Sequence, residues 1–199
     1  DRSITFILGF SVKAQITQQG QDIDGEASFD YSGSSVSINA IGDLIAIGAP
    51  TNDGNGSYSG HVRVYEWSGS SWIQRGQDID GENSGDQCGH SVSMNAAGNL
   101  VAIGAIHNDA NGNSSGQVRV YEWNGIIWTQ KGQDIDGEAT YDQSGFSVSM
   151  NNSGNILAIG ANGNNSDKGH VRVYSWIANS WVQLCLLYTS DAADDSLGV

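Results

Sequence analysis

The chain has few of the residues that would mark several familiar protein classes. Its 199 residues include one proline and two cysteines, Cys88 and Cys185. Two cysteines cannot build a disulfide framework, and their spacing is not that of a zinc site, so we interpret Cys88 as a small packed residue. Apolar runs are also short, since residues 4–10 form one that is too short to span a bilayer. We therefore expect no membrane insertion.

Positive charge is scarce as well. Eight Lys and Arg stand against 22 Asp and Glu, which gives a formal net charge of −14. Such a chain repels phosphate backbones and anionic lipids, so we expect no nucleic acid partner. Cations, basic proteins and neutral glycans remain open as ligands. The alternative, that the charge serves only solubility, also remains open.

What the chain has in abundance is repetition. The hexapeptide Gln-Asp-Ile-Asp-Gly-Glu begins at Gln21, Gln77 and Gln133, with a constant spacing of 56 residues. Each copy contains four short apolar or alternating segments that are separated by polar, Gly-containing turns. A Gly-rich period near 50 residues with four such segments is typical of propeller blades. In the first copy the segments are residues 35–38, 44–49, 62–67 and 72–74.

We therefore predict an all-β fold, a β-propeller built of four-stranded antiparallel blades, here an incomplete ring of about three blades. The repeats cover residues 15–184. Between its second and third segments the last copy is three residues shorter than the first, which indicates a surface loop there. The three units run from about 21–76, 77–132 and 133–184.

Both ends depart from the repeat. Residues 1–14 combine an apolar run with small residues, which predicts a partial secretory signal peptide; an irregular first strand is the alternative. Residues 185–199 share nothing with the repeat, and we interpret them as a non-native read-through tail. Residues 17–20 match residues 129–132, the end of a fourth strand, so we expect the chain to be a fragment whose missing blades lie C-terminal to it.

The tryptophans occupy only two positions of the repeat. Large aromatic side chains at fixed blade positions usually fill the space between sheets, so we predict core packing. Stacking platforms for sugars are the alternative. The six residues are Trp67, Trp72, Trp123, Trp128, Trp176 and Trp181.

Taken together, these motifs resemble the FG-GAP repeat, the blade of the integrin alpha-subunit propeller and of many secreted bacterial and algal proteins. The Gly-Ala-Pro signature stands whole at residues 48–50, and Val-Arg-Val-Tyr at residues 62–65 is similar to the family's following strand. The resemblance covers roughly residues 15–184 and implies a secreted or cell-surface protein. Calcium-binding members carry an Asp-rich loop between the first two strands, where this chain has only tight turns. That calcium site is therefore not carried over.

The acidic segment at the start of each copy is the remaining candidate for a metal site. Its carboxylates lie at relative positions 1, 3, 5 and 9, and clusters of oxygen ligands suit a hard cation such as calcium. Calcium binding is one hypothesis, and an acidic turn that only solubilises the loop is the other. The candidate metal ligands are Asp22, Asp24, Glu26, Asp30, Asp78, Asp80, Glu82, Asp86, Asp134, Asp136, Glu138 and Asp142.

The up-and-down strand order places these acidic links beside the loops between the second and third strands. That rim is polar and Gly-rich, and it is where the copies differ in length, so we predict that it contacts the ligand. The candidate rim residues are Asn52, Asp53, Asn55, Asn108, Asp109, Asn111, Asn162 and Asn164.

Enzyme motifs are absent from the sequence. It has no Gly-x-Ser-x-Gly elbow, His-Glu-x-x-His pair or phosphate loop, and identical carboxylates in every copy argue against an asymmetric glycosidase pair. His61 and His170 share one repeat position, where Gln117 replaces them, as expected of a tolerant surface site. We thus predict no catalytic residues and no enzyme.

The predicted function is a secreted or cell-surface repeat module that mediates adhesion or protein recognition, with an extracellular protein or glycan as its partner. Two alternatives remain open. One is a carbohydrate-binding or carbohydrate-active propeller module, and the other is a structural spacer in a larger surface protein.

Overall fold

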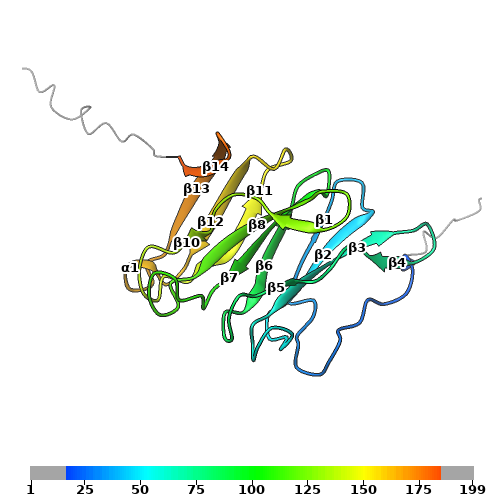
Figure 1. Ribbon diagram of the computed structural model, residues 1–199, viewed down its shortest axis with the longest axis horizontal. Coiled ribbons are helices and arrows are strands. Elements are labelled where there is room, and N and C mark those ends of the chain that lie inside the picture. The colour runs from blue at the N-terminus through cyan, green and yellow to red at the C-terminus, as the bar shows by residue number, and fades with distance from the viewer. Residues whose placement is uncertain (1–16, 185–199) are drawn as a thin grey trace, which may run out of the picture.

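The computed structural model describes residues 17–184, and these form three antiparallel β-sheets that lie side by side along the long axis of the molecule (Figure 1). This confirms the predicted all-β architecture of propeller blades, and the three blades do not close into a ring. The predicted signal peptide at 1–14 and the tail at 185–199 lie outside the described residues. Within residues 17–184, no helix is long and apolar enough to cross a membrane.

All three sheets repeat the same order, in which the first four strands of each copy pair antiparallel in succession. The first sheet contains β1 (Ser35–Ile38), β2 (Leu44–Ala49), β3 (His61–Trp67), β4 (Trp72–Gln74) and β5 (Ile79–Asp80). The second contains β6 (Cys88–Met94), β7 (Leu100–Ala105), β8 (Gln117–Trp123), β9 (Trp128–Gln130) and β10 (Ile135–Asp136). The third contains β11 (Ser144–Met150), β12 (Ile156–Ala161), β13 (His170–Ile177) and β14 (Ser180–Gln183), with the short α1 (Asn164–Asp167) before β13.

The acidic hexapeptide is more than a link between blades. Asp80 of β5 pairs with His61 at the start of β3, and Asp136 of β10 pairs with Gln117 at the start of β8. The isoleucine between the two aspartates supplies the reason, because Ile79 and Ile135 are both buried. The outer edge of each of these two sheets is thus built from two short strands, and the second and third hexapeptides each extend the sheet of the copy before them.

Neighbouring sheets touch through their backbones. The Ser35 hydroxyl of the first sheet donates a hydrogen bond of 2.7 Å to the Gly89 carbonyl of the second sheet. A Cβ atom at Gly48 would overlap that same carbonyl oxygen, so glycine is required where β2 meets the next sheet. Gly104 meets the carbonyl of Gly145 in the same way. The glycine of the Gly-Ala-Pro signature therefore sets the distance between blades.

Tryptophans pack each sheet against the chain segment that enters it. Trp67–Trp72, Trp123–Trp128 and Trp176–Trp181 form tilted pairs with ring centroids 5.2–5.4 Å apart. The indole of Trp128 donates to the Arg75 carbonyl, and the Arg75 guanidinium lies 4.9 Å from the centre of the Trp123 ring. Trp128 and Trp181 are buried. The expectation of core packing is confirmed for those two residues.

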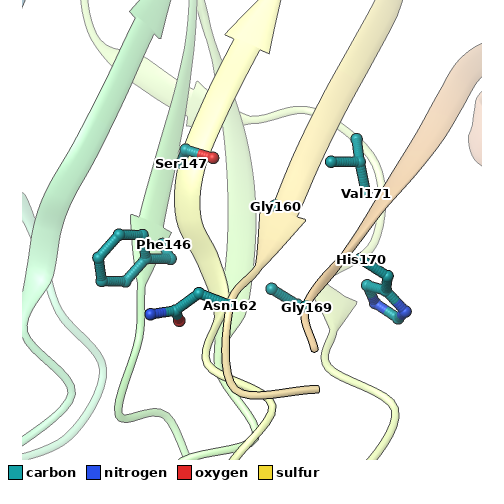
Figure 2. Close-up of a pocket in the computed structure, with 8 residues that line it drawn as sticks. Phe146, Ser147, Gly160, Asn162, Gly169, His170 and Val171 are labelled. Atoms are coloured by element: carbon teal, nitrogen blue, oxygen red, sulfur yellow. The ribbon is translucent and has the colours of Figure 1, made fainter. Parts of the chain in front are cut away.

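The far face of the third sheet lacks the cover that the other two sheets have. Val62 and Val118 are fully buried, whereas Val171 at the same repeat position is 67% exposed. Figure 2 shows Val171, Phe146 and Ser147 around Gly160, where they line an open hollow of about 340 Å³. In the first two copies the next sheet covers this position. The face of the third sheet is thus shaped like a blade interface.

We predict that Gly48→Ala destabilises the chain by about 1–3 kcal/mol, because the added methyl group must push the second sheet away. Gly160→Ala is the matched control. Its methyl group would meet only the Ser147 hydroxyl, which can rotate, so the loss should stay below about 1 kcal/mol. Urea unfolding measures both values. Equal losses would contradict the role assigned to Gly48.

Candidate functional site

Two sets of loops gather along one edge of the three sheets, which we call the loop edge: residues 22–34, 50–60, 78–87, 106–116, 134–143 and 161–169. The Asn55 side chain donates to the Gly81 carbonyl at 2.8 Å, and Asn111 donates to the Gly137 carbonyl at the same distance. In Figure 1, α1 and the loop before β1 both lie along the lower edge. The predicted proximity of the rim and the acidic segments is confirmed. The ligand role of the rim stays a prediction.

The last carboxylate of each acidic segment holds its own loop together. Oδ2 of Asp86 accepts hydrogen bonds from the backbone N–H of Asn83 and from the side-chain amide of Asn108, both at 3.1 Å. Asp30 makes the same two contacts with Ala27 and Asn52. Asp142 caps Ala139. All three aspartates are buried. The predicted rim residues Asn52 and Asn108 are therefore structural side chains in these loops.

The third carboxylate and the backbone of each segment are held by a buried arginine. Arg119 donates to the Asp80 carbonyl at 2.9 Å, and its second terminal nitrogen lies 3.4 Å from Glu82. The guanidinium also lies 5.6 Å from the centre of the Tyr121 ring, and burial raises the pKa of that tyrosine to about 12. Arg63 and Arg172 repeat the contacts with the carbonyls of Asp24 and Asp136 and with Glu26 and Glu138.

Cys88 lies against this arginine in the second sheet. Its sulfur is 3.7 Å from the Arg119 guanidinium and is fully buried. Burial raises the pKa of the Cys88 thiol to about 11, so the thiol stays protonated near neutral pH. Its structural role as a small packed residue is confirmed.

The first carboxylate of each segment is fixed by a glutamine four residues earlier. Oδ1 of Asp78 accepts a hydrogen bond of 2.6 Å from Gln74, and Asp134 accepts one of 2.7 Å from Gln130. Asp22 and Gln18 repeat the pair. The first, third and fourth carboxylates of one segment thus point to separate partners, and those contacts do not form a shared cage. Calcium binding stays a prediction.

One convergent group does form within residues 17–184, and it combines two segments with a strand. Glu26, His61 and Asp78 each offer a ligand atom, and these atoms all lie within 4.8 Å of one another. The imidazole of His61 is 2% exposed. The expectation of a tolerant surface position is therefore wrong for His61. Its alternation with Arg63 and Tyr65 along the strand was the available signal, since all three side chains share one face.

Exposed aromatic side chains are the feature of the loop edge that the sequence analysis missed. Phe29, Tyr31, Tyr58 and Tyr141 are 78%, 64%, 54% and 62% exposed. All four have a positive φ, from 50° to 74°, a region that large side chains rarely adopt. Their place beside the buried Asp30 and Asp142 could have drawn attention to three of them. No periodic pattern marks them, because each lies in a turn.

A polar hollow of about 390 Å³ opens in the same edge at the second copy. Its lining includes Glu82, Asp109, Gln117 and Asp134. The amide of Gln117 donates to Asp136 at 3.2 Å, while its oxygen is buried without a hydrogen-bond partner in the described part of the chain. The hollow is therefore lined by carboxylates, and a buried amide oxygen without a hydrogen-bond partner lies at its wall.

Comparison with known proteins supports the fold and assigns no family. No family model matches the chain, and no curated protein matches it. Among solved structures it is similar to the hydrazine synthase of Kuenenia stuttgartiensis, with 13% identity and a TM-score of 0.50 over 74% of this chain and 35% of that one. Sqt1 of Saccharomyces cerevisiae gives 14% identity and a TM-score of 0.50 over 79% and 36%. The chain spans about a third of each protein, and likeness at this identity bears on fold alone.

We predict that Asp86→Ala costs about 2–4 kcal/mol of stability in metal-free buffer, because the buried Asn108 amide and the partly buried Asn83 N–H lose their acceptor. Asp134→Ala is the control from the same set of predicted metal ligands. It loses only a contact with the exposed Gln130, so it should cost less than about 1 kcal/mol. Thermal unfolding checks both. If Asp86 serves mainly to bind a metal, its removal without metal should stabilise the chain.

Proposed function

We propose that this chain is a non-catalytic recognition module of the FG-GAP type, secreted or displayed at the cell surface, and that it binds an extracellular protein or glycan through the loop edge. The observation that carries the proposal is the set of exposed aromatic side chains in left-handed backbone on that edge. Aromatic residues supply much of the binding energy in protein and glycan recognition, since they bury a large area with few torsions to fix.

A comparison of the copies shows which positions of the loop edge need a left-handed backbone and which of them need an aromatic side chain. The positions of Phe29 and Tyr58 are held by Gly85 and Ser114 in the second copy, and all four have a positive φ. The turn therefore demands the left-handed conformation in each copy, but it does not demand an aromatic residue. A residue such as Phe29 costs of order 1–3 kcal/mol in that conformation, and strain of this kind concentrates at binding sites.

The same loops hold these aromatic residues in place. The Tyr58 N–H donates to Oδ1 of Asp53 at 2.8 Å, and the buried Asp30 lies between Phe29 and Tyr31 in the sequence. Because these carboxylates stabilise turns in each copy, their contacts follow the repeat and show no asymmetric acid–base pair. This supports binding over catalysis.

The acidic charge favours a basic or neutral partner. At a net charge of −14, association with a basic protein should accelerate at low salt, whereas glycan binding should be nearly independent of salt. Calcium remains a hypothesis for the acidic segments. The β1–β2 connection, where calcium-binding members of the family carry their Asp-rich loop, is a tight turn in this chain. Oδ1 of Asn39 closes the turn by accepting hydrogen bonds from the backbone N–H groups of Gly42, Asp43 and Leu44.

A carbohydrate-binding role is the second candidate, and one observation favours it. Tyr31, Tyr58 and Tyr141 present exposed rings with a hydroxyl group, the kind of surface on which sugar rings stack. The buried Trp128 and Trp181 cannot serve this purpose.

We predict that a loop-edge variant with Phe29→Gly and Tyr58→Ser binds its partner at least tenfold more weakly. Both replacements are the residues of the second copy, so the fold should be kept, and release of the backbone strain at Phe29 should raise the stability by about 1–3 kcal/mol. The purified chain would be applied to panels of extracellular proteins and of glycans, and the strongest binder would be measured by surface plasmon resonance.

The control variant carries Ile41→Ser and Ile126→Ser. Both isoleucines are about 80% exposed and lie in turns at the opposite edge of the sheets, with Ile41 at 81% and Ile126 at 79%. Their replacement should leave binding intact. Equal binding by the loop-edge variant and the unmodified chain would refute the assignment of this edge.

A further inference from the structure

His61 lies between two carboxylates without bonding to either. Its Nδ1 is 3.8 Å from Oδ2 of Asp78 and 4.0 Å from Oε2 of Glu26. Both distances exceed the range of a hydrogen bond. A polar side chain that is almost completely buried is thus directed at two oxygens with a gap between them.

Each carboxylate is anchored through its other oxygen. Oε1 of Glu26 lies 3.3 Å from the Arg63 guanidinium, and Oδ1 of Asp78 accepts from Gln74 at 2.6 Å. Outer contacts of this kind orient the carboxylate ligands of metal sites and leave one oxygen free to coordinate. The two free oxygens both face the imidazole.

The spacing is close to that of a bound ion. Two ligand atoms of a tetrahedral zinc site lie about 3.4 Å apart, because each is about 2.1 Å from the metal. The distances of 3.8 Å and 4.0 Å from the imidazole, and a separation of at most 4.8 Å between any two ligand atoms, require shifts of less than about 1.5 Å. The side chains of Glu26 and Asp78 are 48% and 30% exposed, so they have room for this movement and water can complete the coordination.

The donor set indicates the class of ion. Calcium prefers oxygen ligands alone, whereas one imidazole with two carboxylates suits zinc and its neighbours among the divalent transition metals. A protonated His61 in a plain ion pair is the competing interpretation, and it would leave no place for a cation.

The second copy repeats the scaffold without the imidazole. Glu82 lies beside Arg119, and Asp134 accepts from Gln130, as their counterparts do in the first copy. Gln117 stands where His61 would be, and its amide oxygen has no partner among the described residues. The second copy thus serves as an internal control for the role of the His61 imidazole, because Gln117 takes its place.

We propose that Glu26, His61 and Asp78 bind a divalent transition-metal ion of the zinc class, at the place where two consecutive acidic segments meet the start of β3. This site is independent of the loop-edge aromatics and of the recognition role. It also differs from the calcium hypothesis, because its ligands come from two segments and a strand.

The test is a calorimetric titration of the full chain, without a polyhistidine tag, with zinc chloride. We expect one saturable equivalent, and His61→Gln should weaken its binding at least tenfold. His170→Gln is the matched control, since His170 faces Glu138 at 3.8 Å and no second carboxylate of the described residues. It should leave zinc binding unchanged. Cobalt absorption in the visible range should report the same site.

A gain-of-site variant keeps the test decisive if His61→Gln does not fold. Gln117→His should add a second zinc equivalent, because Glu82 and Asp134 are already in place. The proposal is overturned if the unmodified chain takes up no more zinc than His61→Gln does. It is also overturned if His170→Gln loses the site to the same extent, or if excess calcium displaces the zinc. Should His61→Gln be unfolded, a missing second equivalent in Gln117→His overturns it.

Discussion

A buried arginine in the third strand of each sheet connects the parts of this protein. Arg119 of β8 donates to the carbonyl of Asp80, which is itself paired with β3 of the preceding sheet. One side chain therefore links two sheets and fixes the acidic segment between them. The contact is favourable because the guanidinium is satisfied by a backbone carbonyl and a half-exposed carboxylate, so that neither partner is stranded in the interior. Arg172 makes the same link to β10 through Asp136.

The loop edge follows from this anchoring. With the segment backbone fixed, Asp86 can cap Asn83 and draw in the amide of Asn108, which belongs to the loop between β7 and β8. The turns that result require left-handed backbone at fixed positions. Most of the carboxylates in these segments thus accept hydrogen bonds within the turns or pair with the buried arginines. Most of the regularity that looks like a repeated ligand set is a repeated folding device.

The strands were predictable because their signals are local. Alternation at Ser35–Ile38 and a continuous apolar run at Leu44–Ala49 depend only on neighbours in the sequence, and both boundaries agree with the structure. The partners of the acidic segments were not predictable in this way. Asp30 bonds to a residue 22 positions away, and Arg63 reaches a carbonyl 39 positions away. The sequence shows that these side chains repeat, but it does not show which contacts they make.

The burial of His61 also could not be predicted from the sequence, because a substitution between copies pointed to the wrong conclusion. Its replacement by Gln117 in the second copy resembles surface tolerance, yet both side chains are buried, and Gln117 lines a hollow together with Glu82 and Asp134. Burial at that position comes from β5 and β10, the two-residue strands that no periodic pattern indicates. A substitution between copies therefore marks a change of chemistry here, and the exposure of the position cannot be inferred from the substitution alone.

The copies differ where a shared scaffold does not constrain them, and three of the four exposed aromatic residues of the loop edge lie in the first copy. Arginine, the capping aspartate and the paired tryptophans recur in all three, as their contacts require. Phe29, Tyr31 and Tyr58, by contrast, have Gly85, Gln87 and Ser114 as their counterparts in the second copy. The third copy keeps an aromatic residue, Tyr141, at the position of Phe29 and a histidine, His170, at that of His61. Since folding does not need an aromatic residue at these positions, the proposed binding role is the simplest physical reason for their presence, and on that proposal most of the aromatic contact surface lies on the first blade.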